Sequence, residues 1–560
     1  MAYFLKKTRL KGRTYLSIVE SFYDGTKKGT AHKIYKSLSS VETLKNKGLE
    51  DPIAYYQAEV DKLNKEREIK KVEFISEEST TRYLGYFLAK AVLNKLDVKN
   101  VFSLFNATTQ FEFDLYDVFS SLVFSRLVKP CSKHKTFHEV LPYLGTKVNY
   151  TYYQLLEALK FYGSNYEKFV ELFTRATNEK YSLNTDTTYF DCTNFYFEID
   201  REDDFRKKGP SKENRKCPIV GLGLLLDSNQ IPIGMKMYPG NESEKPVLRE
   251  IISELKKQNN ISGKTIHVAD KGLNCARNIY AAKKNGDGYI FSKSVKTLPE
   301  TEKAWVLLNN DYKIVKDNEN RVIFYYKSCI DKFPYNYTDE NGKIHRFTLT
   351  EKRLVTYNPL LARKKCFEID RMVEKARGLC ASKAKRDEYG DSSRYVDFKG
   401  ADGTNAKVSI NEEKIARDKK LAGFNIIVTS ETTMKDRDIY DVYHNLWRIE
   451  ESFRIMKSDL DARPVYLQTE EAIKGHFLIC YVAVLLERIL QFNVFENKYS
   501  SNDFYNFFKE FKVTKGKKEY TNTSTDTPFI KEMAAYTNLP LRNLYLSPAQ
   551  YERILNYNFN

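Results

Sequence analysis

Between residues 189 and 292, the order of apolar and polar residues limits the fold more than any other feature of the chain. The run 219–226 (IVGLGLLL) is almost continuously apolar and ends at a tight turn. Strands are predicted at 189–199, 219–226, 231–238, 265–269 and 289–292, with an amphipathic helix at 245–258. Three hairpin-connected strands followed by alternating helix and strand predict a mixed α/β sheet. This order of elements matches a ribonuclease-H-like domain.

The rest of the chain is arranged around this predicted core. A basic leader with a hairpin signal precedes a helical segment, and a β-rich insertion with one charged helix interrupts the core. The chain then returns to the core with a strand at 424–430 and one long helix at 436–460. The predicted segments are 1–75 (basic N-terminal hairpin region), 76–184 (helical DNA-binding domain), 185–293 and 424–495 (two parts of the core), 294–423 (insertion domain) and 496–560 (C-terminal region).

Charge and composition indicate the kind of partner and the compartment. Lysine and arginine number 91 and aspartate and glutamate 74, an excess of +17 that favours a polyanion, with nucleic acid the leading candidate. The first residues lack the apolar segment of a signal peptide. The longest apolar run, 477–486, is about half the length that spans a bilayer and indicates a buried helix. Scattered cysteines fit a reduced, cytosolic compartment. The short apolar run indicates no membrane partner.

Two aspartates lie where a metal-dependent nuclease would need them. Phosphoryl transfer on nucleic acid commonly uses two divalent metals held by carboxylates. Asp191 lies inside the first predicted strand among aromatic residues, where an ionised carboxylate is costly without a cation. Asp186 is a competitor that precedes the strand proper. Asp270 ends the fourth strand, where ligands of open α/β sheets gather; the alternatives are a half-exposed strand aspartate and a helix N-cap.

The late helix carries an acid and cations on one predicted stripe. At about 100° per residue, Tyr443, Glu450, Arg454 and Lys457 lie on the same side, and Glu451 falls outside it. One acid for a metal and two cations for phosphate suit a phosphoryl-transfer site. The alternative is an ordinary ion pair between Glu450 and Arg454 on a solvated face.

The sequence resembles the DDE-type transposases of bacterial insertion sequences, in the insertion-sequence-four superfamily with its Tyr-x2-Arg-x3-Glu-x6-Lys signature. Tyr443, Glu450 and Lys457 match that spacing, while Leu446 stands at the arginine position. Residues 219–244 look like the family's second and third strands with their Gly-Asn-x-x-Glu end. Residues 267–278 (HVADKGLNCARN) look like its second-aspartate segment.

The resemblance implies that Asp191, Asp270 and Glu450 are the catalytic triad and hold two Mg²⁺ or Mn²⁺ ions. It also implies that 294–423 is the family's insertion domain, and that Tyr443 and Lys457 position phosphate. The family's arginine contacts phosphate near the cut end. Because leucine cannot do so, we expect Arg454 or Arg448 to replace it, with Arg454 at the better angle.

Both tryptophans of the chain are candidates for stacking on an extruded base. Trp447 lies in the signature helix and Trp305 opens the predicted insertion; the alternative for each is core packing. Cys131, His134 and His138 have a zinc-like spacing, but the sequence offers no fourth ligand nearby, so a zinc site is not expected.

Together these observations predict a cytoplasmic, nucleoid-associated bacterial transposase. We expect it to cleave double-stranded DNA at terminal repeats and to join the freed 3′-hydroxyl to target DNA, acting as a homodimer on DNA. The basic leader and the helices of 76–184 are expected to recognise the repeats. Two alternatives remain: a ribonuclease-H-like nuclease without strand transfer, and a DNA-binding protein with a decayed site.

Overall fold

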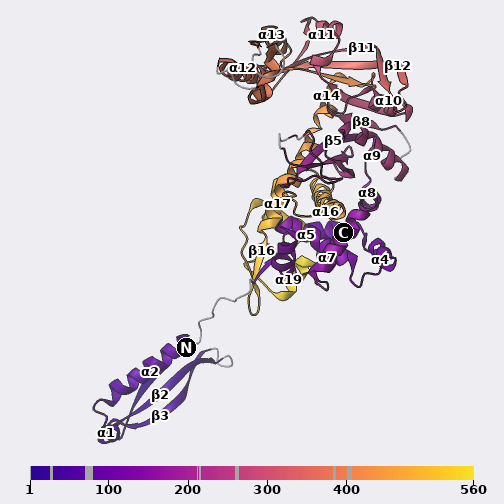
Figure 1. Ribbon diagram of the computed structural model, residues 1–560. Coiled ribbons are helices and arrows are strands. Elements are labelled where there is room, and N and C mark those ends of the chain that lie inside the picture. The colour runs from indigo at the N-terminus through magenta and orange to yellow at the C-terminus, as the bar shows by residue number, and fades with distance from the viewer. Residues whose placement is uncertain are drawn as a thin grey trace. The chain divides into compact units, whose positions relative to one another are not determined.

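The computed structural model describes residues 2–24, 29–69, 80–210, 212, 216–258, 264–381, 386–399 and 407–559. The chain forms two compact units, Met1–Thr80 and Thr81–Asn560 (Figure 1). Each unit is described by itself below.

The first unit is a three-stranded antiparallel sheet with helices on one face. Its elements are β1 (Tyr3–Leu10), β2 (Arg13–Asp24), β3 (Gly29–Ser40), α1 (Val41–Asn46) and α2 (Pro52–Ile69). Leu16 and Ile18 of β2 are buried. On the same face, the backbone N–H of Tyr3 donates to Asn64 of α2 at 2.8 Å, and Arg67 of α2 pairs with Glu20. The predicted hairpin is therefore present, and β1 widens it to a sheet.

A helical layer occupies much of the region between residues 87 and 181. Its main helices are α3 (Phe87–Lys95), α4 (Lys99–Ala107), α5 (Leu115–Val128), α7 (Tyr152–Ser164) and α8 (Tyr166–Tyr181), with the short α6 (Lys133–Lys135), η1 (Thr136–Val140) and η2 (Leu141–Tyr143). The apolar helix α16 (Glu470–Arg488), continued by η6 (Ile489–Val494), packs among α5 and α7 (Figure 1). It is long and apolar enough to cross a membrane, but most of it is buried in this helical core.

One nine-stranded mixed sheet, in the order β10-β11-β12-β15-β9-β8-β5-β6-β7, forms the rest of the core. Its strands are β5 (Thr187–Tyr196), β6 (Ile219–Leu226), β7 (Pro232–Pro239), β8 (Ile266–Ala269), β9 (Gly288–Lys293), β10 (Lys313–Lys316), β11 (Val322–Thr338), β12 (Ile344–Tyr357) and β15 (Phe424–Thr429). The strands β5, β6 and β7 form an antiparallel meander, and β8 and β9 run parallel to β5. The predicted mixed α/β sheet is confirmed.

Three strands between residues 294 and 423, β10, β11 and β12, belong to the core sheet, while residues 396–399 and 407–410 pair in a separate two-stranded sheet. β15 pairs with β9 on one side and with β12 on the other, and β11 and β10 follow outward. The segment also contains η3 (Val295–Thr297), α11 (Glu300–Leu307), α12 (Pro359–Ala381), η4 (Arg386–Tyr395), β13 (Val396–Lys399), β14 (Lys407–Ile410) and α13 (Glu412–Lys420). Ile369 and Val373 of α12 pack with Tyr395 and Ile415 in a small core of their own.

The two faces of the sheet are covered by different helices because side chains alternate along each strand. Tyr189 and Leu224 share a hydrophobic cluster with α16. Phe190 and Leu225 face the other cluster, which includes residues of α9 (Glu244–Gln258) and α10 (Ala276–Lys284). Asp191, two residues after Tyr189, therefore lies on the α16 side of the sheet.

The long helix expected at 436–460 is divided into three parts, which corrects that prediction. They are α14 (Asp436–His444), α15 (Trp447–Arg454) and the π-helix η5 (Ile455–Asp459). At the junction the N–H groups of Leu446 and Arg448 bond to carbonyls three residues earlier, at Tyr443 and Asn445. The tighter turn there changes the direction of each following side chain, so a uniform 100° step does not hold across it.

The C-terminal region packs on the start of the second unit. β16 (Lys512–Lys515) pairs with β4 (Thr81–Tyr83) and with β17 (Tyr520–Asn522), which pairs with β18 (Tyr545–Leu546). The helices here are α17 (Ser501–Glu510), α18 (Pro528–Thr537) and α19 (Pro548–Leu555).

The crossing of α7 and α16 depends on glycine, which gives a first prediction. A Cβ on Gly475 would collide with the backbone carbonyl of Leu159, and backbone cannot move aside cheaply. Gly475→Ala should therefore lower the free energy of unfolding by about 1–3 kcal/mol or more. Gly378→Ala in α12 is the control, because its Cβ meets no atom within 4 Å and alanine favours a helix by up to about 1 kcal/mol. Equal effects in thermal unfolding would contradict this account.

Candidate functional site

Asp191 and Asp270 lie side by side because β5 and β8 are parallel neighbours. The printed register ends with Phe190 opposite Ala269, so the next residue on each strand is an aspartate. Adjacent strands are roughly 4.8 Å apart, and paired residues point to the same face. The competitor Asp186 is exposed and precedes β5. The fold thus brings together the two aspartates that the sequence singled out.

Two hydroxyl groups hold Asp270. Ser292 of β9 donates to Asp270 Oδ1 at 2.8 Å, and Tyr443 of α14 donates to the same oxygen at 3.1 Å. Burial, and then the charge of Asp270, raise the pKa of Tyr443, so its hydroxyl remains a donor at neutral pH. These bonds fix the orientation of Asp270 and tie α14 to the end of β8.

Of the two aspartates, Asp191 is the one whose ionisation is made unfavourable by burial. Burial raises its pKa to about 6; the nearby ammonium of Lys212 opposes this shift, and the charges of Glu244 and Asp270 add to it. Lys212 Nζ lies 3.7 Å from Asp191 Oδ1 and 3.6 Å from Glu244 Oε1, and it also donates to the carbonyl of Cys192. A single cation therefore stands between two carboxylates.

Sequence reasoning missed both Lys212 and Glu244 as members of the site. Glu244 could have been found, because it closes the Gly-Asn-x-x-Glu end of the segment that resembles the transposase family. Lys212 carries no local signal that separates it from the many other lysines. Both side chains line a cavity of about 400 Å³ that also includes Asn194 and Gly272. Neither Asp191 nor Asp270 lines this cavity, which reaches the pair through Lys212, the residue that contacts Asp191.

The two adjacent glutamates of α15 have different environments. Glu451 accepts from Arg488 at 3.1 Å and lies 3.9 Å from Arg454. Glu450 is exposed, and its charge contributes to the raised pKa of Tyr443. Tyr443 is therefore close to both Asp270 and Glu450. The assignment of Glu450 rather than Glu451 to the site remains a prediction.

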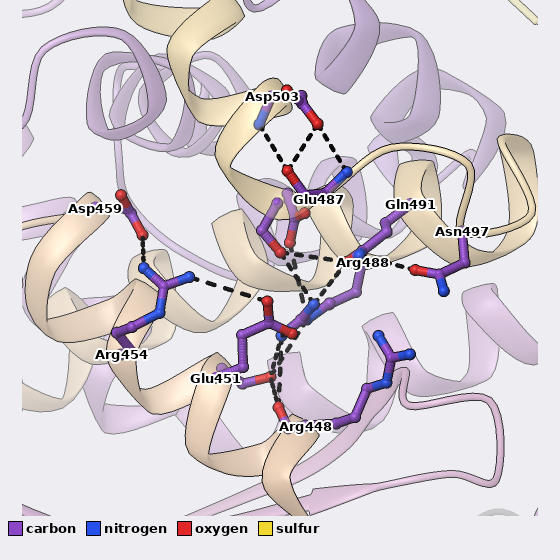
Figure 2. Close-up of polar contacts among 12 residues, drawn as sticks. Arg448, Glu451, Arg454, Asp459, Glu487, Arg488, Gln491, Asn497 and Asp503 are labelled. Atoms are coloured by element: carbon purple, nitrogen blue, oxygen red, sulfur yellow. Dashed lines mark hydrogen bonds and ion pairs between the residues drawn. The ribbon is translucent and has the colours of Figure 1, made fainter. Parts of the chain in front are cut away.

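Arg488 of α16 determines which way α15 faces (Figure 2). Its side chain is completely buried. Besides Glu451, it donates to Ser452 at 3.1 Å, to Gln491 at 2.6 Å and to Ser501 at 3.1 Å. With Glu451 and Ser452 turned toward Arg488, Glu450 is left on the solvent side of α15.

The remaining predicted residues surround this site or lie apart from it. Arg454 is half exposed and its Nη1 donates to Asp459 at 3.1 Å, as Figure 2 shows. The guanidinium of Arg448 lies 4.4 Å from the ring centre of Trp447. The ammonium of Lys457, in η5, lies 5.5 Å from the ring of Phe195 in β5.

The two tryptophans differ in exposure. Trp447 is 50% exposed, which contradicts the core-packing alternative for this residue. Trp305 of α11 is partly buried against the cluster on the α9 side of the sheet. Its carbonyl accepts from Lys327 at 2.6 Å. Leu446, at the position of the family's arginine, packs against the main core and offers no charge.

The chemistry of the donors suits a hard divalent cation. Asp191, Asp270, Glu244 and Glu450 offer only oxygen ligands, which Mg²⁺ and Mn²⁺ prefer. The ammonium of Lys212 already occupies a position between two of these carboxylates. In the described part of the chain, however, no three His, Cys, Asp or Glu side chains are placed so that they could hold one ion. The residue types therefore fit a metal, while the spacing is wider than a metal site requires.

The raised pKa of Asp191 predicts a pH-dependent effect of its replacement. The pKa is about 6 in the folded protein and about 3.9 in an unfolded chain. Because the folded state binds this proton more tightly, ionising Asp191 costs stability as the pH rises from 4 through 6. In EDTA, Asp191→Asn should gain roughly 1–3 kcal/mol over wild type at pH 8 and little at pH 4. A difference in urea unfolding that is the same at both pH values would contradict this.

The buried ion pair predicts a second contrast. Arg488→Met leaves Glu451 and Glu487 without their buried cation, which should cost about 3–5 kcal/mol. Arg454→Met removes a half-exposed pair with Asp459 and should cost about 1 kcal/mol or less. Thermal unfolding of the two variants measures the contrast. A loss of similar size in both would show that Arg488 does not hold α15.

Comparison with known proteins identifies the family. A family model described as the transposase DDE domain matches residues 188–486, more than half of the chain. No match to a curated protein was found. The matched region begins in β5 and ends in α16, so it includes Asp191, Asp270 and Glu450. The resemblance to DDE-type transposases is thus confirmed, and the chain belongs to the transposase DDE domain family.

Proposed function

We propose that the protein cuts DNA at the ends of an insertion sequence and joins the freed ends to target DNA. The proposal rests above all on the adjacency of Asp191 and Asp270 at the ends of paired parallel strands within the matched family region. The strand order β7-β6-β5-β8-β9 supports a ribonuclease-H-like core. In this reading 294–423 is an insertion that adds strands to the edge of that core.

Three carboxylates would carry the metal-dependent chemistry. Asp191, Asp270 and Glu450 would hold two Mg²⁺ or Mn²⁺ ions, which supply charge stabilisation of the attacking and leaving oxygens. Tyr443 and Ser292 keep one oxygen of Asp270 hydrogen-bonded and so present the other toward the site. Glu450 would approach from α15, whose direction Arg488 fixes.

The reaction would have two steps. A water oxygen attacks the phosphorus at the element's end; the bond from phosphorus to the 3′-oxygen breaks, and that oxygen leaves as a 3′-hydroxyl after taking a proton. The same 3′-hydroxyl then attacks a target phosphorus, and a target 3′-oxygen leaves. Each step exchanges one phosphorus–oxygen bond for another, so no energy-rich cofactor is required.

Several residues would contact DNA around the reacting phosphate. Lys457 and Tyr443 would position phosphate, and Arg454 or Arg448 would take the place of the arginine that Leu446 lacks. Half-exposed Trp447 is accessible for stacking on an extruded base, and Trp305 is proposed for the same task.

The proposals for binding of the terminal repeats and for dimerisation follow from what DNA transposition requires. The basic N-terminal unit and the helices between residues 76 and 184 would bind the terminal repeats of double-stranded DNA. Pairing two ends requires two copies, so we propose a homodimer on DNA. A location in the bacterial cytoplasm, with the nucleoid, follows from this substrate.

The two adjacent glutamates provide the decisive test. Glu450→Gln should reduce metal-dependent cleavage of a DNA end by more than the roughly 10- to 100-fold that loss of an outer-shell partner costs, with an unchanged melting temperature. Glu451→Gln should do the reverse, because it weakens a buried ion pair while the folded fraction still cleaves. Cleavage that survives Glu450→Gln would contradict the assignment of the triad.

A joining assay separates the proposal from its alternatives. A precut end incubated with plasmid should yield a covalent product with the wild-type protein. Cleavage without joining would indicate a nuclease of the same fold. Binding without metal-dependent cleavage would indicate a DNA-binding protein with a decayed site.

A further inference from the structure

The face of the N-terminal sheet that is turned away from α2 is exposed at its margins, while Val19 at its centre is buried between Phe4 and Ile34. Register places Phe4, Lys6, Arg13, Tyr15, His32 and Ile34 on this outer face, opposite to the face of Leu16 and Ile18. Phe4 is 37%, Tyr15 39% and Ile34 62% exposed. Helix α2 covers the other face, so among the described residues of the first unit no helix covers the outer face of the sheet.

The charge of the unit lies on its strands and not on its helix. From Tyr3 to Ser40, the described strands and the turn at Lys11 carry seven lysine or arginine residues and two acids, Glu20 and Asp24. Register places Lys6 and Arg13 on the outer face, whereas Lys7, Arg9, Lys33 and Lys36 alternate to the α2 side. Helix α2 carries three basic and four acidic residues. Glu20 lies on the α2 side, where Arg67 neutralises it. The outer face therefore carries the charges of Lys6 and Arg13 and, among its residues with described side chains, no acid, so its net charge is positive.

The hairpin between β1 and β2 places cations at the tip of the sheet. Lys11 and Gly12 both have positive φ, 45° and 74°, as in the two-residue turns that match the twist of paired strands. Leu10 and Arg13 are the last pair of the ladder. Arg9, Lys11 and Arg13 therefore gather at one end of the sheet, where they can reach phosphate groups on both sides of a groove.

The dimensions and chemistry of this face match one groove of DNA. The major groove is roughly 12 Å wide and admits a two-stranded β-ribbon. The β1–β2 hairpin, whose strand axes are about 4.8 Å apart, fits that width, and β3 lies beside it. Exposed Phe4, Tyr15 and Ile34 can contact thymine methyl groups, which only the major groove displays. Lys6 and Arg13 can reach guanine edges or phosphates. The minor groove, about 6 Å wide, is too narrow for the sheet.

We propose that the outer face of the β1–β3 sheet enters the major groove of duplex DNA, with the Lys11 turn on the phosphate backbone. This inference rests on the proposed function only in taking DNA as the partner. It assigns recognition by the first unit to a sheet, and it leaves α2 on the side away from the DNA.

The test uses full-length protein and the fluorescence anisotropy of a labelled duplex at several salt concentrations. Lys6→Gln with Arg13→Gln removes two charges from the outer face; Lys62→Gln with Lys65→Gln removes two from exposed positions of α2. The first variant should bind roughly tenfold more weakly, with a salt slope smaller by about 2. The second should bind like the wild type. Equal losses in both variants, or none in the first, would overturn the proposal.

A second arm asks which groove is used. The same duplex is prepared with glucosylated hydroxymethylcytosine, whose sugars fill the major groove. Wild-type protein should lose affinity for it, and Lys6→Gln with Arg13→Gln should lose little more. Undiminished wild-type binding to the filled groove would overturn the proposal.

The competing occupant of this face is a second copy of the chain. If Ile34→Lys converts a dimer to a monomer in sedimentation without DNA, while Lys6→Gln with Arg13→Gln leaves duplex affinity unchanged, the face is an interface between copies and the proposal fails. None of these measurements uses cleavage. A protein that binds as expected but never cuts DNA would refute the proposed function and leave the role of the sheet intact.

Discussion

The parallel pairing of β5 with β8 is the constraint on which the site depends. It sets two aspartates next to each other at a place where their charges repel and water is partly excluded. Burying two neighbouring carboxylates is unfavourable by itself. The backbone hydrogen bonds of the sheet nevertheless keep them in this position. The cost appears in the raised pKa of Asp191. Lys212 offsets part of that cost, and a divalent cation would offset more of it.

The other half of the site depends on a buried arginine far along the chain. Arg488 lies in the apolar helix α16, where an uncompensated charge would be very unfavourable. Its partners, Glu451 and Ser452, are both in α15, so satisfying Arg488 also fixes the direction of that helix. Tyr443 connects the two halves, since it bonds to Asp270 and lies close enough to Glu450 to feel its charge. The adjacent glutamates thus differ: Glu451 pairs with buried Arg488, and Glu450 is exposed on the side of Tyr443.

Local sequence patterns were sufficient to predict many strands of the core sheet. The strand runs at 189–199, 219–226 and 231–238 were recognisable because buried strands require continuous apolar segments and turns require particular residues. Asp270 was predictable because it directly follows such a run. The long helix was predicted as one piece, since the composition of Asn445 and Leu446 gives no strong sign of the tighter turn between α14 and α15. The strands β10, β11 and β12 were expected in an insertion, and nothing in their sequence indicated that they would extend the core sheet.

The sequence by itself determined the positions of the core strands, the candidate aspartates and the family resemblance, because each can be recognised from short local runs of residues. The tertiary structure alone decided that Lys212 and Glu244 stand beside Asp191, that Glu451 pairs with Arg488, and that the outer face of the N-terminal sheet is exposed at its margins. Those outcomes depend on which distant groups share a buried space, and there the balance of desolvation against charge pairing is set by long-range packing. The periodicity of apolar residues in the sequence does not predict which charged groups will be buried together.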